Sequence, residues 1–128
     1  MLLHLTDLSA EPLQAQIIRQ IRAKILAGEL SAGADLPSIR RFAREHHISV
    51  ITVQRAYEGL EREGLIHSRR GKGFFVSKIS DKTKKMMAKE KLHDSLKPGI
   101  EDALAEGLDR EEVKHVVQTL LGKVRGKK

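Results

Sequence analysis

Hydrophobic positions near the N-terminal end of the chain recur with the spacing of an amphipathic helix. Between Pro12 and Gly28 the apolar residues fall every four positions, and polar residues fill the other faces. Pro12 suits a first helical turn, and Gly28 lies just past the predicted end. A loop over residues 29–37 follows, with Gly33 and Pro37 as breakers. The stripe of this first predicted helix is Leu13, Ile17, Ile21 and Ile25.

Two further helices are predicted directly after this loop. Ser38 is a typical N-cap for a short helix whose apolar side is Ile39, Phe42 and Ala43. After a tight connection over residues 46–48, Ser49 caps a third helix, which ends at Gly64. Its apolar residues stand at i, i+3, i+4 and i+7 and form one buried stripe: Val53, Ala56, Tyr57 and Leu60.

Two short strands are predicted next, over residues 65–68 and 74–76, and the sequence Arg-Arg-Gly-Lys-Gly joins them. Three helices followed by a hairpin is the element order of a winged helix-turn-helix. The predicted fold is therefore mainly α with a small β-hairpin, in a DNA-binding domain over residues 8–77.

The remaining residues predict a second, purely helical segment. Residues 78–97 are rich in Lys with sparse apolar positions, and apolar residues then continue at spacing four. Asp109 and Glu112 form a capping-box pattern at the start of a last helix, whose apolar residues are Val113, Val116, Val117, Leu120 and Leu121. We expect a helical dimerisation segment over 78–122 and a basic flexible tail over 123–128.

Pro98 falls inside the first helix of this segment. Proline lacks an N–H and clashes with the carbonyl four residues earlier. We therefore expect a kink or a break between Leu96 and Gly99.

Composition narrows the class of protein. The chain has 128 residues, a formal net charge of +7 and no cysteine, which excludes disulfides, thiolate chemistry and Cys-based zinc sites. The positive charge suits a nucleic acid or an anionic membrane surface, and equally well plain solubility. No signal peptide is apparent, and no apolar run approaches the roughly 20 residues of a membrane span. We expect a cytoplasmic protein.

The third predicted helix carries the candidate base contacts. With its stripe buried, the helix turns Ile51, Thr52 and Arg55 outward, flanked by Gln54. A helix fits the major groove, where Arg pairs with guanine, Gln with adenine, and Thr contacts a phosphate or a base. Ile51 is either a scattered exposed apolar residue or a contact to a thymine methyl group.

Two more groups of residues suit phosphate contacts. Ser38, Arg40 and Arg41 open the second helix, where free N–H groups and arginines bind anions; the alternative is surface arginines without a partner. The hairpin turn places three cations and two glycines at its tip, namely Arg69, Arg70, Gly71, Lys72 and Gly73. Alone this turn could be an ordinary solvated tip, but in this order of elements it is a wing.

Catalytic interpretations find little support. Residues 71–73 do not form a P-loop, because the earlier glycine and the following Ser or Thr are missing. The six histidines are scattered without metal-ligand spacing, although a metal or ligand site assembled across a dimer stays open. We expect no enzyme activity and no cofactor.

Residues 12–76 resemble the DNA-binding domain of the GntR family of bacterial regulators. The resemblance rests on Gly33, Leu36-Pro37-Ser38 with Arg40, Ser49, Thr52-Val53, Ala56-Tyr57, Leu60-Glu61, Gly64-Leu65 and the wing over 71–76. It implies DNA contacts from Ser38, Arg40, Ser49, Thr52, Gln54, Arg55, Arg70, Gly71 and Gly73. Many members have Arg in place of Val50, Arg or Lys in place of Gln54, and Gly in place of His47. His is among the residues that tolerate a positive φ, so the turn is expected to survive.

The segment after the wing is similar to that of the YtrA-like subfamily, although Lys97-Pro98-Gly99 interrupts where that subfamily continues its helix. In the subfamily a two-helix tail mediates dimerisation, and the regulated genes often encode ABC-type transporters. The resemblance thus implies a homodimeric, repressor-type regulator that binds double-stranded DNA at a palindromic operator, with an effector that the sequence does not identify. An RNA-binding winged helix and a protein–protein adaptor are the alternatives.

Overall fold

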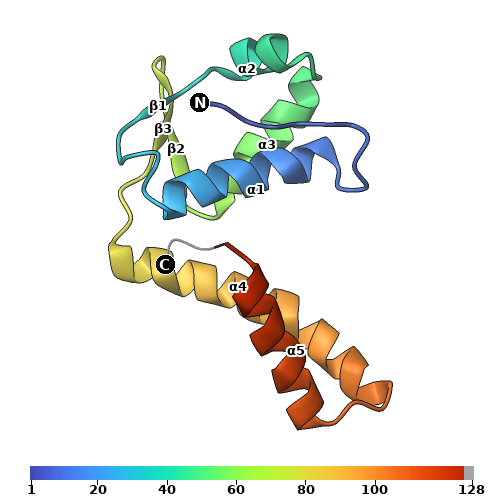
Figure 1. Cartoon of the computed structure of the whole chain (residues 1–128). Coiled ribbons are helices and arrows are strands. Elements are labelled where there is room, and N and C mark those ends of the chain that lie inside the picture. Colours follow the sequence, from blue (N-terminus) through green and yellow to red (C-terminus); the bar gives the residue numbers. More distant parts are fainter. Residues whose placement is uncertain (126–128) are drawn as a thin grey trace. The chain divides into compact units, whose positions relative to one another are not determined.

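The structure, a computed structural model, describes residues 1–125 and divides into two compact units (Figure 1). The first unit covers residues 1–85, and the second begins at residue 86. Of the expected tail over 123–128, residues 126–128 lie outside the described part. Within residues 1–125, no helix combines the length and the apolar character needed to cross a membrane.

The first unit contains three helices and a small sheet, which confirms the predicted fold class. The helices are α1 (Leu13–Leu26), α2 (Ile39–His46) and α3 (Val50–Arg62), and the strands are β1 (Asp35–Leu36), β2 (Ile66–Arg69) and β3 (Gly73–Val76). The sheet is antiparallel with the order β1-β3-β2. Strand β1 lies in the segment that was predicted to be a loop. The sequence pattern does not reveal this strand, because only two of its residues pair and their partners are about forty positions away, as in Asp35 with Phe75.

The core of this unit lies between α1 and α3. The predicted stripe of α3 is fully buried, as are Ile17, Ile21 and Ile25 of α1. Gly59 lies in the same contact, and a Cβ at this position would stand 2.9 Å from the Cδ1 atom of Ile18. The two helices are therefore packed closely, and this packing fixes the side of α3 that remains outside.

Both predicted caps of the helix-turn-helix are present. The Ser38 side chain accepts a hydrogen bond from the backbone N–H of Arg41 (3.1 Å), and Ser49 accepts one from Thr52 (3.0 Å). Between the two helices His47 adopts the left-handed conformation, with φ 55°. The turn is thus formed with His in the position that favours glycine.

An N-terminal segment that the periodicity did not reveal lies along α1. The Gln20 amide accepts a hydrogen bond from the N–H of His4 and donates one to its carbonyl oxygen. Gln16, which is buried, makes the equivalent pair of hydrogen bonds with Thr6. Leu3, which directly precedes His4, is buried as well. Two glutamines one helical turn apart on α1 thus bind the backbone of the extended N-terminal segment, as the backbone of a neighbouring strand would in a sheet.

The second unit consists of most of α4 (Asp81–Ala105) and of α5 (Arg110–Lys123). Helix α4 continues through Pro98, so a break between Leu96 and Gly99 is wrong, whereas a kink at this position stays a prediction. A proline in a helix costs roughly 3 kcal/mol. The helix tolerates this cost because its 25 residues keep the helical turns before and after Pro98. The uninterrupted helix also places Leu96 and Ile100 on one apolar side.

The predicted capping box begins α5. The Asp109 carboxylate accepts from the N–H of Glu112 (2.9 Å), and the Glu112 carboxylate accepts from the N–H of Asp109 (3.0 Å). Gly107, with φ 104°, turns the chain between the two helices. Neither helix has a fully buried side chain among the described residues, so this unit has little core of its own.

Candidate nucleic-acid interface

The outward side of α3 presents the residues that the sequence assigned to base contacts. Ile51, Gln54 and Arg55 are exposed, and Thr52 is half-buried. The Thr52 hydroxyl lies 2.9 Å from that of Ser49, so both hydroxyl groups belong to the helix cap. Within residues 1–125, the side chains of Gln54 and Arg55 have no hydrogen bond or ion pair. Their donors are available to a ligand.

The two arginines at the start of α2 differ in their surroundings. Arg41 lies 3.4 Å from the carboxylate of Glu45, one turn along the helix, and both side chains are solvent-exposed. Arg40 is exposed and has no ion-pair partner in the described part of the chain. Arg40 is therefore the freer cation of the two for a phosphate.

The wing is the hairpin turn between β2 and β3. The N–H of Lys72 donates to the carbonyl of Arg69 and closes the turn (2.9 Å), while Gly71 and Gly73 take φ values of 74° and 104°. The guanidinium of Arg69 lies over the ring of Phe75, 5.3 Å from its centroid. Arg69 is thus partly engaged within the sheet.

The other two wing cations, Arg70 and Lys72, project into solvent. Figure 1 shows the wing tip, α2 and the start of α3 at the same end of the first unit. The elements that carry the exposed cations Arg40 and Arg55, together with the wing tip, therefore gather at one end of this unit. Such an arrangement attracts a polyanion.

Tyr57, which the sequence assigned only to the core, connects α3 with the other elements of the candidate surface. Its ring meets Phe42 of α2 and Phe74 of β3 edge-on, with centroids 6.1 and 5.0 Å away. Burial raises the pKa of its hydroxyl, which remains neutral. Tyr57 thus joins α3 to α2 and to the wing strand. The periodicity places Tyr57 on the buried stripe but cannot reveal these partners.

His, Asp and Glu side chains do not gather in groups of three that could hold a metal ion anywhere in residues 1–125. A site shared between two chains stays a prediction.

The fold and this surface define a winged helix-turn-helix DNA-binding domain. Residues 13–76 match the family described as bacterial regulatory proteins, gntR family. The chain is also 32% identical over 120 residues to the HTH-type transcriptional repressor YtrA of Bacillus subtilis, covering 94% of this chain and 92% of that relative. The chain belongs to the GntR family, and its similarity to YtrA includes the helical segment.

Solved structures support this assignment. A protein described as a transcriptional antiterminator from Listeria monocytogenes EGD-e superimposes with a TM-score of 0.72 at 28% identity, covering 98% of both chains. The DNA-binding domain of AraR in complex with operator ORE1 gives a TM-score of 0.50 at 25% identity, covering 60% of this chain and 94% of that domain. The chain is thus a DNA-binding transcriptional regulator and not an enzyme, as the sequence predicts.

Proposed function

We propose that the chain is a repressor that binds, as a homodimer, an operator made of two half-sites in inverted orientation. One observation carries the proposal: Arg55 and Gln54 stand exposed and unpaired, within the described residues, near the start of α3. Helix α2, which carries Arg40, and the wing lie at the same end of the unit. Helices of this kind place their N-terminal residues against base edges in the major groove.

The proposed contacts divide into base readout and phosphate binding. Arg55 and Gln54 read bases, since their side chains match the acceptor and donor pairs of guanine and adenine. The remaining contacts position the domain on the duplex and carry little sequence information. They come from Ser38, Arg40, Arg41, Ser49, Thr52, Arg69, Arg70, Gly71, Lys72 and Gly73.

The comparisons supply the support for an operator and for repression. The AraR domain was solved on an operator, and the Bacillus subtilis relative is described as a repressor. A repressor of a bacterial promoter acts in the cytoplasm, where the chromosome lies.

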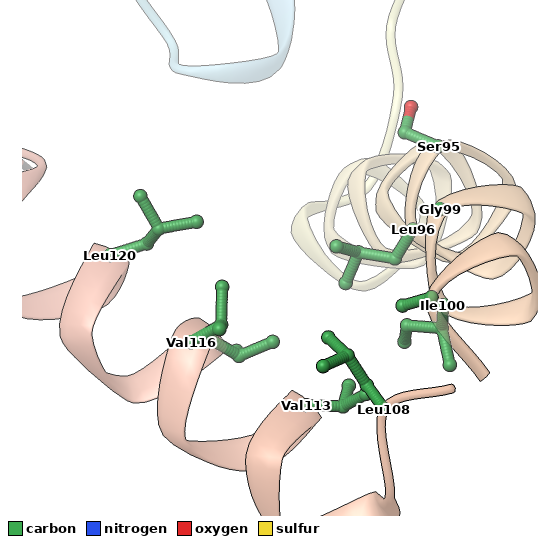
Figure 2. A pocket seen from close by; sticks show the side chains of 10 residues that line it. Ser95, Leu96, Gly99, Ile100, Leu108, Val113, Val116 and Leu120 are labelled. Carbon is green, nitrogen blue, oxygen red and sulfur yellow. The ribbon is translucent and has the colours of Figure 1, made fainter. Parts of the chain in front are cut away.

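The second unit supports the homodimer. Its two helices enclose an open groove of about 250 Å³, lined by nonpolar side chains of α4 and α5. Figure 2 shows Leu96 and Ile100 on one side of it and Val116 and Leu120 on the other. Val116 and Leu120 remain half exposed, at 50% and 53%. Helices with so little buried surface are marginal alone, and a second copy would cover them.

Selection of random duplexes by the purified full chain tests the proposal. We expect enrichment of two inverted half-sites about one DNA turn apart, or a multiple of it, with two chains bound per duplex. Duplex RNA of the enriched sequence serves as the control and should bind far more weakly at 200 mM salt.

Enrichment of one unsymmetric site with a single bound chain would contradict the homodimer. Equal affinity for the RNA would contradict operator readout. Transcription in vitro from a promoter that overlaps the enriched site tests repression, and a rise in transcript on adding the protein would overturn it.

A further inference from the structure

Two apolar side chains are exposed next to each other at the beginning of the recognition helix. Val50 and Ile51, the first two residues of α3, are 45% and 59% exposed. The other large hydrophobic residues that are exposed in the described first unit are Met1, Leu2 and Leu8, all close to the N-terminus. In the helix-turn-helix itself, Val50 and Ile51 thus form an isolated apolar surface.

The fold does not require apolar residues at these positions. The apolar stripe of α3 that packs on α1 is fully buried without them, and the cap of the helix comes from Ser49 and the N–H of Thr52. Val and Ile are also weaker helix formers than Ala or Glu at an exposed site, because they lose χ1 freedom. Their placement therefore suggests contact with a ligand.

The surroundings of this surface indicate the kind of ligand. Arg55 lies one helical turn further along α3, and Arg40 lies on α2, both exposed and without partners in the described residues. An apolar surface with a free arginine one turn further along the same helix suits an anionic ligand that also carries an apolar group. In the major groove of DNA, the group of this type on a base edge is the 5-methyl group of thymine.

We propose that Val50 and Ile51 together form a contact surface for thymine 5-methyl groups, so that each half-site is read partly by apolar contact. The inference rests on the proposed operator binding and adds a base and the residues that recognise it. Arg55 and Gln54 read hydrogen-bonding groups, whereas Val50 and Ile51 read the methyl group, which no hydrogen bond can detect.

Replacing thymine by deoxyuridine removes only this methyl group and leaves the base pair and its hydrogen bonds unchanged. In the operator obtained by selection, each thymine of a half-site is replaced in turn, and the dissociation constant of the full chain is measured. We expect at least one position at which affinity falls about fourfold, which corresponds to about 0.8 kcal/mol for one methyl group at 1.4 kcal/mol per tenfold change.

Alanine variants then connect the methyl group with the two side chains. Val50→Ala and Ile51→Ala should weaken binding to the thymine operator, and deoxyuridine at the sensitive position should have no further effect on the variant that lost the contact. Glu58→Ala, an exposed change two turns along the same helix, is the control and should retain the full fourfold effect. Urea unfolding checks that all three variants are folded.

The outcomes separate the two proposals. If no sequence is enriched, operator binding fails, and this inference fails with it. If an operator is bound but its half-sites contain no thymine, or deoxyuridine changes affinity less than twofold everywhere, the inference alone is overturned. It is also overturned if both alanine variants keep the full deoxyuridine effect, because the methyl group is then recognised elsewhere.

Discussion

The hydroxyl group of Tyr57 donates a hydrogen bond of 2.7 Å to the carbonyl oxygen of Pro37. Pro37 comes directly before Ser38, the N-cap of α2, so a buried residue of α3 holds the chain where the helix-turn-helix begins. The Tyr57 ring also contacts Phe74 in the wing strand. One side chain of α3 therefore contacts both the start of α2 and the wing strand.

Tyr57→Phe removes this hydrogen bond and keeps the ring. We expect the free energy of unfolding to fall by about 1 kcal/mol, because the Pro37 carbonyl loses its partner but is not fully enclosed. Urea unfolding measures the change. An unchanged free energy of unfolding would mean that water replaces the hydroxyl at no cost.

The control is the pH dependence of the difference in free energy of unfolding between the native chain and Tyr57→Phe. Burial raises the pKa of Tyr57, while a tyrosine in the unfolded chain ionises near 10. The stabilisation that the neutral Tyr57 hydroxyl contributes is fully present below about pH 10. It is lost as the pH rises above about 10, since only the unfolded state then releases the hydroxyl proton. The advantage of the native chain over Tyr57→Phe should therefore shrink above pH 10. An advantage that grows there would contradict the burial of the hydroxyl.

Gly59 tests how closely α1 and α3 are packed. In Gly59→Ala the new Cβ would meet the terminal methyl of Ile18, which can move, and alanine favours the helix by about 1 kcal/mol. We expect the free energy of unfolding to stay within about 1 kcal/mol of the native value. Gly59→Leu should lower it by about 1–3 kcal/mol, because a leucine cannot fit between the helices. Equal stability of the two variants would mean a looser contact.

Local signals in the sequence predicted most of the fold. The stripe of α3 and the caps at Ser38 and Ser49 depend on residues within one or two turns, and the structure contains all of them. Strand β1 and the hydrogen bonds of Gln20 with His4 depend on partners far along the chain, which periodicity cannot reveal.

The same distinction applies to the candidate surface. Its residue types and order could be predicted, but how far each cation is engaged could not. Arg41 has Glu45 as a neighbour, and Arg69 lies on Phe75, while Arg55 stands free among the described residues. These differences arise from side-chain geometry. They show which arginines are free to bind a ligand, which cannot be read from the sequence alone.

Arg55 and Lys72 should affect DNA binding in different ways. Arg55→Ala should cost about 1–3 kcal/mol on the selected operator and relax discrimination at one base pair of each half-site, because a base contact is lost. Lys72→Ala should weaken binding to all sequences about equally and reduce the salt slope by about one, because a phosphate contact is lost.

Dissociation constants on the operator and on an unrelated duplex, each at two salt concentrations, separate the two effects. If both variants lose specific and nonspecific affinity in the same proportion, the division into base and phosphate contacts is wrong.

Leu120 tests whether the groove of the second unit is the dimer interface. In Leu120→Asp a charge replaces an apolar side chain that lines the groove and is half exposed in one chain. Burying this charge between two copies would be costly, so sedimentation should show monomers at micromolar concentration. Operator affinity should then fall by a factor of about 100 or more, because the two half-sites are no longer linked. Gln118→Asp, exposed on α5 and outside the groove, adds the same charge and should leave the dimer intact. A Leu120→Asp variant that keeps its helicity and still dimerises would exclude the groove and place the interface elsewhere.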